Sequence, residues 1–265
     1  MRTRRWPLLS LLAFGYAFLY IPVLLLVIYS FNASRLVTVW GGFSTHWYGE
    51  LLGNDQILDA AWLSVRIATV NATLAMVLGA LAAMALVRYG RFRGRGGFEL
   101  LLTAPLVMPD VLIGLSLLLL FVAMQQAIGW PDGRGFTTIA IAHITFSMAY
   151  ATVVIRARLA QMDRSLEEAA QDLGARPLVV YLRITLPLMA PALLSAWLLA
   201  FTLSLDDLVI SSFVAGPAST TLPMVVYSSV RLGLSPQINA LASLILLFVS
   251  LAVIIAGLTM ARRRV

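Results

Sequence analysis

The sequence predicts an all-α integral membrane protein with six transmembrane helices, organised as a single domain over residues 1–265. Composition is the first reason, because 60% of the residues are hydrophobic, 12% are charged, and the mean hydropathy is +0.90. A soluble domain is about 45–50% apolar and about 25% charged. Pattern is the second reason, because apolar runs long enough to cross a bilayer alternate with short polar segments.

The first apolar run follows three arginines and is too long for the core of a signal peptide, which is about 7–15 residues, so we expect a retained helix. Prolines are expected to break the third run and to turn the chain into the fifth, at Pro105, Pro109, Pro187 and Pro191. The expected spans are residues 7–31, 59–87, 98–124, 136–155, 188–214 and 237–261.

Arginine sets the expected orientation, because the chain contains no lysine and all 19 of its Lys and Arg residues are arginines. They gather at both termini, in the loop after the second span and in residues 156–187, and only Arg35, Arg134 and Arg231 fall on the opposite loops. Arginine-rich loops stay in the cytoplasm, so we expect both termini and residues 156–187 to be cytoplasmic. This layout accounts for the net charge of +7 without a nucleic-acid partner.

Residues 165–187 form the only long polar interruption between the apolar runs. Ser165 and Glu168 have the spacing of a capping box, which predicts that a helix begins at Ser165. Gly174 predicts the end of this helix, since glycine readily adopts the left-handed conformation of a C-terminal cap. A second short helix is expected from Pro177, so this coupling segment should contain two helices with a bend between them.

The same segment carries a spaced motif, Glu-Ala-Ala, three residues, Gly, nine residues, Ile-x-Leu-Pro, between Glu168 and Pro187. It resembles the EAA loop of type I ABC importer permeases. In that family the loop is a coupling helix that docks into a cleft on a separate ATPase subunit. The resemblance implies this role for Glu168, Ala169, Ala170 and Gly174. The alternative is that Glu168 only caps a helix lying on the membrane surface.

Three acids lie within the predicted spans, at Asp110, Asp206 and Asp207. An ionised side chain at mid-bilayer costs roughly 2.5–3.5 kcal/mol, so these acids are candidates for lining a substrate pathway. No arginine lies deep in a span to neutralise them, which favours a cationic solute. Asp206 and Asp207 point about 100° apart on a helix, so one could line the pathway while the other faces a neighbouring helix. The alternative is that the acids are protonated or bonded to backbone at a helix break.

Stretches around these acids extend the resemblance to nearly the whole chain. PLVMPDVLIGLSLLLLF, FTLSLDDLVISSFV, TTLPM and SPQINALASL resemble the polyamine branch of these permeases, in particular the second permease subunit of putrescine importers, with spermidine permeases similar. The resemblance implies a six-helix fold in the bacterial inner membrane and a heterodimer with a second, related permease. It also implies two ABC ATPase subunits and a periplasmic polyamine-binding protein as partners.

The chain itself is not expected to be an enzyme. Without lysine it has no Walker A motif, so we expect no cofactor here, with ATP and Mg²⁺ used by the partner ATPase. No catalytic or metal-binding pattern emerges from the sequence. The lone His143 is expected to form an interhelical hydrogen bond rather than to bind a ligand.

Three alternatives stay open. Within the family, the solute could be another organic cation or an iron carrier. A proton-coupled secondary cation transporter could use the acids as a proton relay, although such folds usually contain two repeated halves, which this sequence does not show. A membrane-embedded enzyme or scaffold lacks a supporting constellation of residues.

Overall fold

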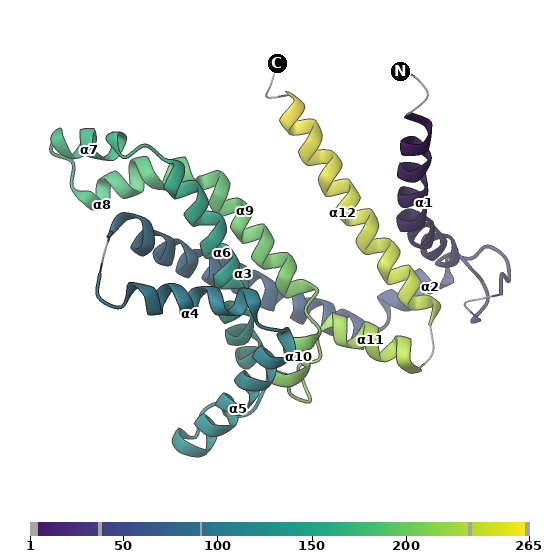
Figure 1. Ribbon diagram of the computed structural model, residues 1–265. Coiled ribbons are helices and arrows are strands. Elements are labelled where there is room, and N and C mark those ends of the chain that lie inside the picture. The colour runs from purple at the N-terminus through teal and green to yellow at the C-terminus, as the bar shows by residue number, and fades with distance from the viewer. Residues whose placement is uncertain (1–4, 37–38, 91, 233–234, 263–265) are drawn as a thin grey trace. The chain divides into compact units, whose positions relative to one another are not determined.

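The computed structural model of this chain describes residues 5–36, 39–90, 92–232 and 235–262, and these are almost entirely helical (Figure 1). Part of the predicted orientation depends on arginines outside these residues, namely Arg2, Arg4, Arg91, Arg263 and Arg264. The helices are α1 (Arg5–Tyr29), α2 (His46–Leu52), α3 (Asp55–Arg88), α4 (Arg95–Val107), α5 (Asp110–Ile128), α6 (Phe136–Gln161), α7 (Ser165–Asp172), α8 (Pro177–Val180), the π-helix η1 (Tyr181–Thr185), α9 (Leu186–Leu205), α10 (Val209–Val214), α11 (Leu222–Leu232) and α12 (Pro236–Arg262).

Five helical segments in the described residues are long and apolar enough to cross a membrane, and a sixth apolar stretch in α12 is shorter. The five are Leu8–Tyr29, Asp55–Arg88, Asp110–Ile128, Phe136–Gln161 and Pro177–Leu205, and the shorter stretch is Pro236–Leu251. These lengths and compositions are those of a multi-pass membrane protein.

The third predicted span, residues 98–124, is divided into two helices rather than forming one broken helix. α4 ends at Val107, and Met108 and Pro109 are extended, with ψ angles of 138° at both residues. A proline disfavours the helical conformation of the residue before it, which explains the break at Met108. Pro105 lies inside α4 and does not end it, so only one of the two predicted breaks occurs.

The fifth span begins without the turn that the sequence predicts at Pro187 and Pro191. Helical residues continue from Pro177 through α8, η1 and α9, and both prolines lie within α9. The turn before Pro187 is a π-turn, in which the Leu186 N–H donates to the Tyr181 carbonyl oxygen. A single π-turn lets a helix absorb a local irregularity and continue.

The same predicted span, residues 188–214, also contains a break near its other end. α9 ends at Leu205, and α10 begins at Val209. Asp206 and Asp207 therefore lie in a short non-helical link rather than on a continuous helix, as the sequence prediction assumed.

The chain forms two compact units, one from Met1–Leu58 with Val226–Val265 and the other from Asp59–Val225. In the first unit, α1 and α2 pack against α12. The Gln237 side chain at the start of α12 donates a hydrogen bond of 2.8 Å to the Glu50 carboxylate of α2. This contact fixes the amino-terminal end of α12 on α2.

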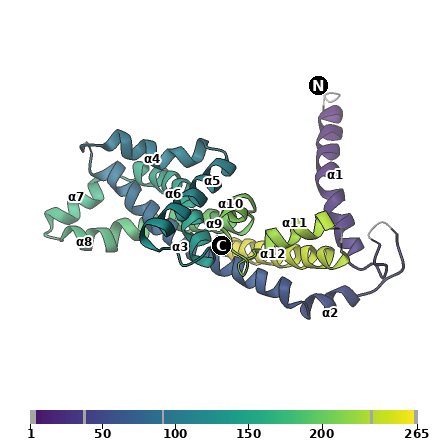
Figure 2. The same ribbon diagram turned by 90° about the horizontal axis from the view of Figure 1, so that it is seen from below.

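In the second unit, small residues let α3, α6 and α9 approach closely. A Cβ added to Gly79 of α3 would lie 3.0 Å from the Ala151 Cβ of α6, so a larger residue would require the two helices to shift apart. α5 and α10 lie side by side in both views (Figures 1 and 2), with Gly114 against the ring of Phe213. α7 and α8 lie at the other end of this unit, away from α5 and α10 (Figure 2).

Candidate functional site

The helix α7 begins as the sequence predicts, at Ser165, but with a different cap. Ser165 is the first helical residue, and its N–H donates 2.9 Å to Asp163 Oδ1. This hydrogen bond lowers the pKa of Asp163 below its ordinary value, because it stabilises the ionised carboxylate. The predicted capping box between Ser165 and Glu168 is therefore wrong, since Asp163 satisfies the first amide instead.

The carboxyl end of α7 is closed by Gly174, which has a φ angle of +85°. The Gly174 N–H donates 2.8 Å to the Gln171 oxygen, and the Ala175 N–H donates 3.0 Å to the Ala170 oxygen. This pair of bonds is a Schellman motif, which a residue with a Cβ adopts only with strain. The predicted helix end at Gly174 is confirmed.

The outer side of α7 is exposed and apolar. Leu173 is 90% exposed and Leu166 is 51% exposed, and the Ala169 side chain is also exposed. Leu166 and Leu173 therefore do not pack into their own unit. Ala170 is half-buried, on the side of α7 that turns toward α8 and η1.

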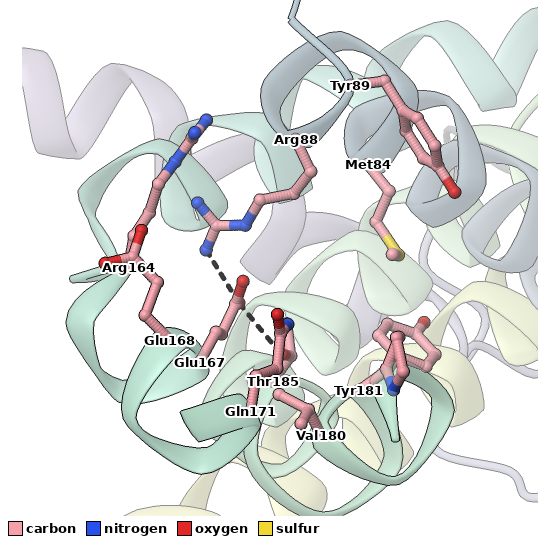
Figure 3. A pocket seen from close by; sticks show the side chains of 11 residues that line it. Met84, Arg88, Tyr89, Arg164, Glu167, Glu168, Gln171, Val180, Tyr181 and Thr185 are labelled. Carbon is pink, nitrogen blue, oxygen red and sulfur yellow. Dashed lines mark hydrogen bonds and ion pairs between the residues drawn. The ribbon is translucent and has the colours of Figure 1, made fainter. Parts of the chain in front are cut away.

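The inner side of α7 is fastened by Glu167, next to the Glu168 of the motif (Figure 3). Glu167 Oε1 forms an ion pair of 2.9 Å with Arg88 Nη2, at the end of α3, and accepts a hydrogen bond of 2.9 Å from Thr185 Oγ1, at the end of η1. The guanidinium of Arg164 donates a further hydrogen bond to the Val87 carbonyl oxygen. We call Arg88, Glu167 and Thr185 the cytoplasmic triad, after the predicted side of the membrane.

The cytoplasmic triad borders a cavity of about 340 Å³. Its lining is Met84, Arg88, Tyr89, Arg164, Glu167, Glu168, Gln171, Pro177, Val180, Tyr181 and Thr185. Glu168 lies on the Arg164 side of this cavity, away from Thr185 (Figure 3). The two adjacent glutamates thus differ, since Glu167 is held inside the unit and Glu168 remains exposed.

Sequence reasoning missed the cytoplasmic triad. The signals present were a second glutamate beside Glu168 and an arginine at the end of a span. Neither signal identifies a partner, because Arg88 and Glu167 are 79 positions apart.

At the helix break after α9, Asp207 is bound to backbone and to a neighbouring helix. Its Oδ2 accepts the Ser211 N–H at 2.7 Å, and its Oδ1 accepts the Ile210 N–H at 3.2 Å. These two amides lie at the start of α10 and have no helical acceptor, so the carboxylate replaces the missing bonds. This geometry matches the alternative in which an acid binds backbone at a break.

His143 of α6 completes this arrangement and is only 2% exposed. Its Nδ1 lies 2.7 Å from Ser204 Oγ, and its Nε2 lies 3.1 Å from Asp207 Oδ2 and 3.0 Å from Ser211 Oγ. The predicted interhelical hydrogen bond of His143 is confirmed. We call His143, Ser204, Asp207 and Ser211 the membrane cluster.

The other two acids are exposed. Asp206 lies in the link beside Asp207, and Asp110 is the first residue of α5, one turn before Gly114, at which α5 packs against α10. Among the described side chains, no hydrogen bond or ion pair joins Asp110 to Asp206 or Asp207. All three acids nonetheless share one property, because each lies at a break between helices. Breaks at membrane depth occur where the backbone is buried in protein or lines a water-filled cavity.

These features place the chain in a class. It belongs to the family of binding-protein-dependent transport system inner membrane components, whose model matches residues 75–264. It is therefore a multi-pass inner-membrane protein. It is 62% identical over 257 residues to the putrescine transport system permease protein PotI of Escherichia coli strain K12, covering 97% of this chain and 91% of that protein. It is 43% identical over 247 residues to the spermidine/putrescine transport system permease protein PotC of the same strain, covering 93% and 90%.

Solved structures confirm the fold. A chain of a bacterial ABC transporter involved in the import of the acidic polysaccharide alginate matches with a TM-score of 0.71 and 16% identity, covering 98% of each chain. A chain of the methionine ABC transporter MetNI, in an inward-facing conformation, matches with a TM-score of 0.60 and 16% identity, covering 78% of this chain and 94% of that one. The fold is that of a type I ABC importer permease.

Proposed function

We propose that this chain is the transmembrane permease subunit of an ATP-driven importer that carries putrescine or a related polyamine across the inner membrane. The observation that carries this proposal is the 62% identity to a putrescine permease along 97% of the chain. Similarity of this extent includes the predicted spans, the coupling segment and both breaks that hold the acids. The similarity to PotC keeps spermidine as the second candidate solute.

The exposed leucines of the coupling segment support the proposal that transport by this chain depends on a separate ATPase subunit. An amphipathic helix that exposes leucines to solvent gains stability when a partner covers them, and α7 exposes Leu166 and Leu173 in this way. We assign α7, with Glu168, Ala169, Ala170 and Gly174, as the part that docks on the ATPase. ATP and Mg²⁺ would be used there, and this chain would catalyse no reaction itself.

The remaining partners follow from the same proposal. A second, related permease would complete the translocation pathway, two ATPase subunits would bind the pair, and a periplasmic binding protein would deliver the polyamine. Both termini of this chain would lie in the cytoplasm, on the side of α7.

The acids supply the attraction for a cationic solute. Asp110 and Asp206 are exposed and available to the ammonium groups of a polyamine. Asp207 already accepts two backbone N–H groups and contacts His143, so we assign it a smaller part in binding and a larger part in holding the break. The pathway would therefore be lined by Asp110 and Asp206, with Asp207 behind them.

Reconstitution tests the proposal. The complete transporter, with its second permease, ATPase and binding protein, is placed in liposomes with radiolabelled putrescine outside. We expect uptake that requires internal ATP and continues after a protonophore collapses the proton gradient. Uptake that needs no ATP and follows the proton gradient would overturn the proposal in favour of a secondary transporter. Competition by spermidine, by unrelated organic cations and by an iron carrier then separates the solutes within the family.

A further inference from the structure

We propose that the cytoplasmic triad transmits movement of α7 to two membrane helices, with Glu167 as the positioning residue between them. This inference rests on the proposed docking of α7 on an ATPase. It concerns residues other than those that face that partner, since Arg88, Glu167 and Thr185 lie on the inner side of α7.

Glu167 connects α7 to both α3 and η1. One carboxylate oxygen, Oε1, contacts both Arg88 Nη2 and Thr185 Oγ1, each at 2.9 Å (Figure 3). Arg88 is the last residue of α3 and Thr185 is the last residue of η1, so three elements meet at one atom. A displacement of α7 changes both distances unless α3 and η1 move with it.

The triad is sheltered from water, which strengthens it. The Arg88 and Glu167 side chains are 14% and 16% exposed, and Thr185 is 3% exposed. A charge-assisted hydrogen bond in such surroundings is stronger than the same pair on an open surface, where ion pairs contribute little. The exposed ion pair between Arg156 and Glu99, each 37% exposed, joins α6 to α4 and does not contact α7.

A second contact acts at the same place. The Arg164 guanidinium, just before α7, donates to the carbonyl oxygen of Val87, next to Arg88 in the last turn of α3. The last carbonyl groups of a helix have no helical donor, so an arginine binds them readily. The start of α7 is therefore attached to α3 at two neighbouring points.

On the other side of the triad, a helix leads directly to the acids. α9 runs for 20 residues from Leu186, next to Thr185, to Leu205, next to Asp206. A helix of that length extends about 30 Å. Movement received at Thr185 thus reaches the link that holds Asp206 and the membrane cluster along one continuous helix.

The test uses Glu167→Gln, which preserves size and removes the charge, in the complete reconstituted transporter. Three quantities are measured: ATPase subunits copurified per permease, ATP hydrolysed, and putrescine imported per ATP. We expect ATPase binding and hydrolysis to be retained and putrescine imported per ATP to fall by at least about fivefold, the scale of a typical coupling between sites. Thr185→Val, which removes one donor and keeps the ion pair, is expected to give a smaller fall.

The matched control is Glu99→Gln, which breaks the other Arg–Glu pair and should leave putrescine per ATP unchanged. The exchange of Arg88→Glu with Glu167→Arg should recover part of the coupling. Unchanged coupling in both Glu167→Gln and Thr185→Val would overturn the proposal, and so would loss of ATPase binding in these variants or an equal fall in Glu99→Gln. If ATPase binding survives Leu173→Asp on the outer face, the docking of α7 fails instead, so the two failures are distinguishable.

Discussion

The cytoplasmic triad and the membrane cluster each contain one acid, but the acid is bound by different kinds of group in the two regions. The triad joins three elements through one ion pair and one hydroxyl, and its charged side chains keep some exposure. In the membrane cluster, the single acid contacts an imidazole and accepts two backbone amides, and two serine hydroxyls contact the imidazole of the almost fully buried His143. The comparison shows that the acid joining three elements is paired with an arginine, whereas the acid at the break after α9 is bound by an imidazole and backbone amides.

The same contrast separates neighbouring acids in each region. Glu167 and Asp207 are held by contacts within the chain, while Glu168 and Asp206 beside them are exposed. In both regions one acid of an adjacent pair is bound within the chain and the other is exposed. Variants of the two acids in each pair should therefore have different consequences.

The largest effect is expected at the outer face of α7. Leu173→Asp replaces the exposed leucine that directly follows α7 with a charge, and covering a leucine contributes about 1.5–3 kcal/mol, so ATPase binding should weaken by roughly 10- to 100-fold. The measurement is copurification of the ATPase, or its titration onto permease in nanodiscs. Ile128→Asp, at an exposed apolar residue at the end of α5, is the control, and equal binding by wild type and Leu173→Asp would contradict the docking.

The next effect separates the acids at the break. Asp206→Asn should lower putrescine uptake by about tenfold, because it removes a free charge that attracts an ammonium group, while protein abundance stays normal. Asp207→Asn should mainly lower the thermal midpoint, because asparagine keeps only one acceptor oxygen and places an NH2 group against one of the two backbone N–H donors. Normal uptake by Asp206→Asn, together with lost uptake and unchanged stability in Asp207→Asn, would reverse the assignment.

A moderate effect is expected at the centre of the membrane cluster. His143→Ala leaves the buried hydroxyls of Ser204 and Ser211 without the ring nitrogens that they contact, and each unsatisfied buried group costs about 1–3 kcal/mol. The thermal midpoint in detergent should fall, with little change in ATPase binding. Thr145→Ala on the exposed face of α6 is a suitable control. A large loss of ATPase binding in His143→Ala would show that the two regions are not separate.

The smallest effect concerns pH at the start of α7. The hydrogen bond from Ser165 lowers the pKa of Asp163 below its ordinary value of 3.8. The stabilisation is therefore complete above that ordinary value and is lost as the pH falls through the lowered one. Hydrogen exchange of the Ser165 amide should show faster local opening in Asp163→Asn at neutral pH. Equal exchange in both proteins would show that Asp163 does not cap α7.

The sequence predicts the membrane class well, because long apolar runs leave a helical protein few alternatives. It also predicts the helix end at Gly174, which follows from one residue's conformational freedom. It does not identify the cap, because Asp163 and Ser165 are both good capping residues two positions apart and only the path of the chain selects between them. The orientation of the termini and the roles of Glu168, Asp110 and Asp206 remain predictions.

The sequence does not predict the interactions between residues that lie far apart along the chain. The triad joins α3 to the coupling segment, and the membrane cluster joins α6 to the link after α9. The sequence does not predict the break at Asp206, because apolar residues continue on both sides of the two acids as they would in an uninterrupted helix. His143 of α6 and the first amides of α10 bind Asp207 at this interruption, and the sequence does not show that they meet there.

The exposure of Leu173 also has a consequence for assembly. In a chain made alone, this leucine and Leu166 remain exposed to water, and exposed apolar side chains favour aggregation. Purified without an ATPase, the subunit should aggregate more readily than the complete transporter, so the order in which subunits are synthesised bears directly on yield.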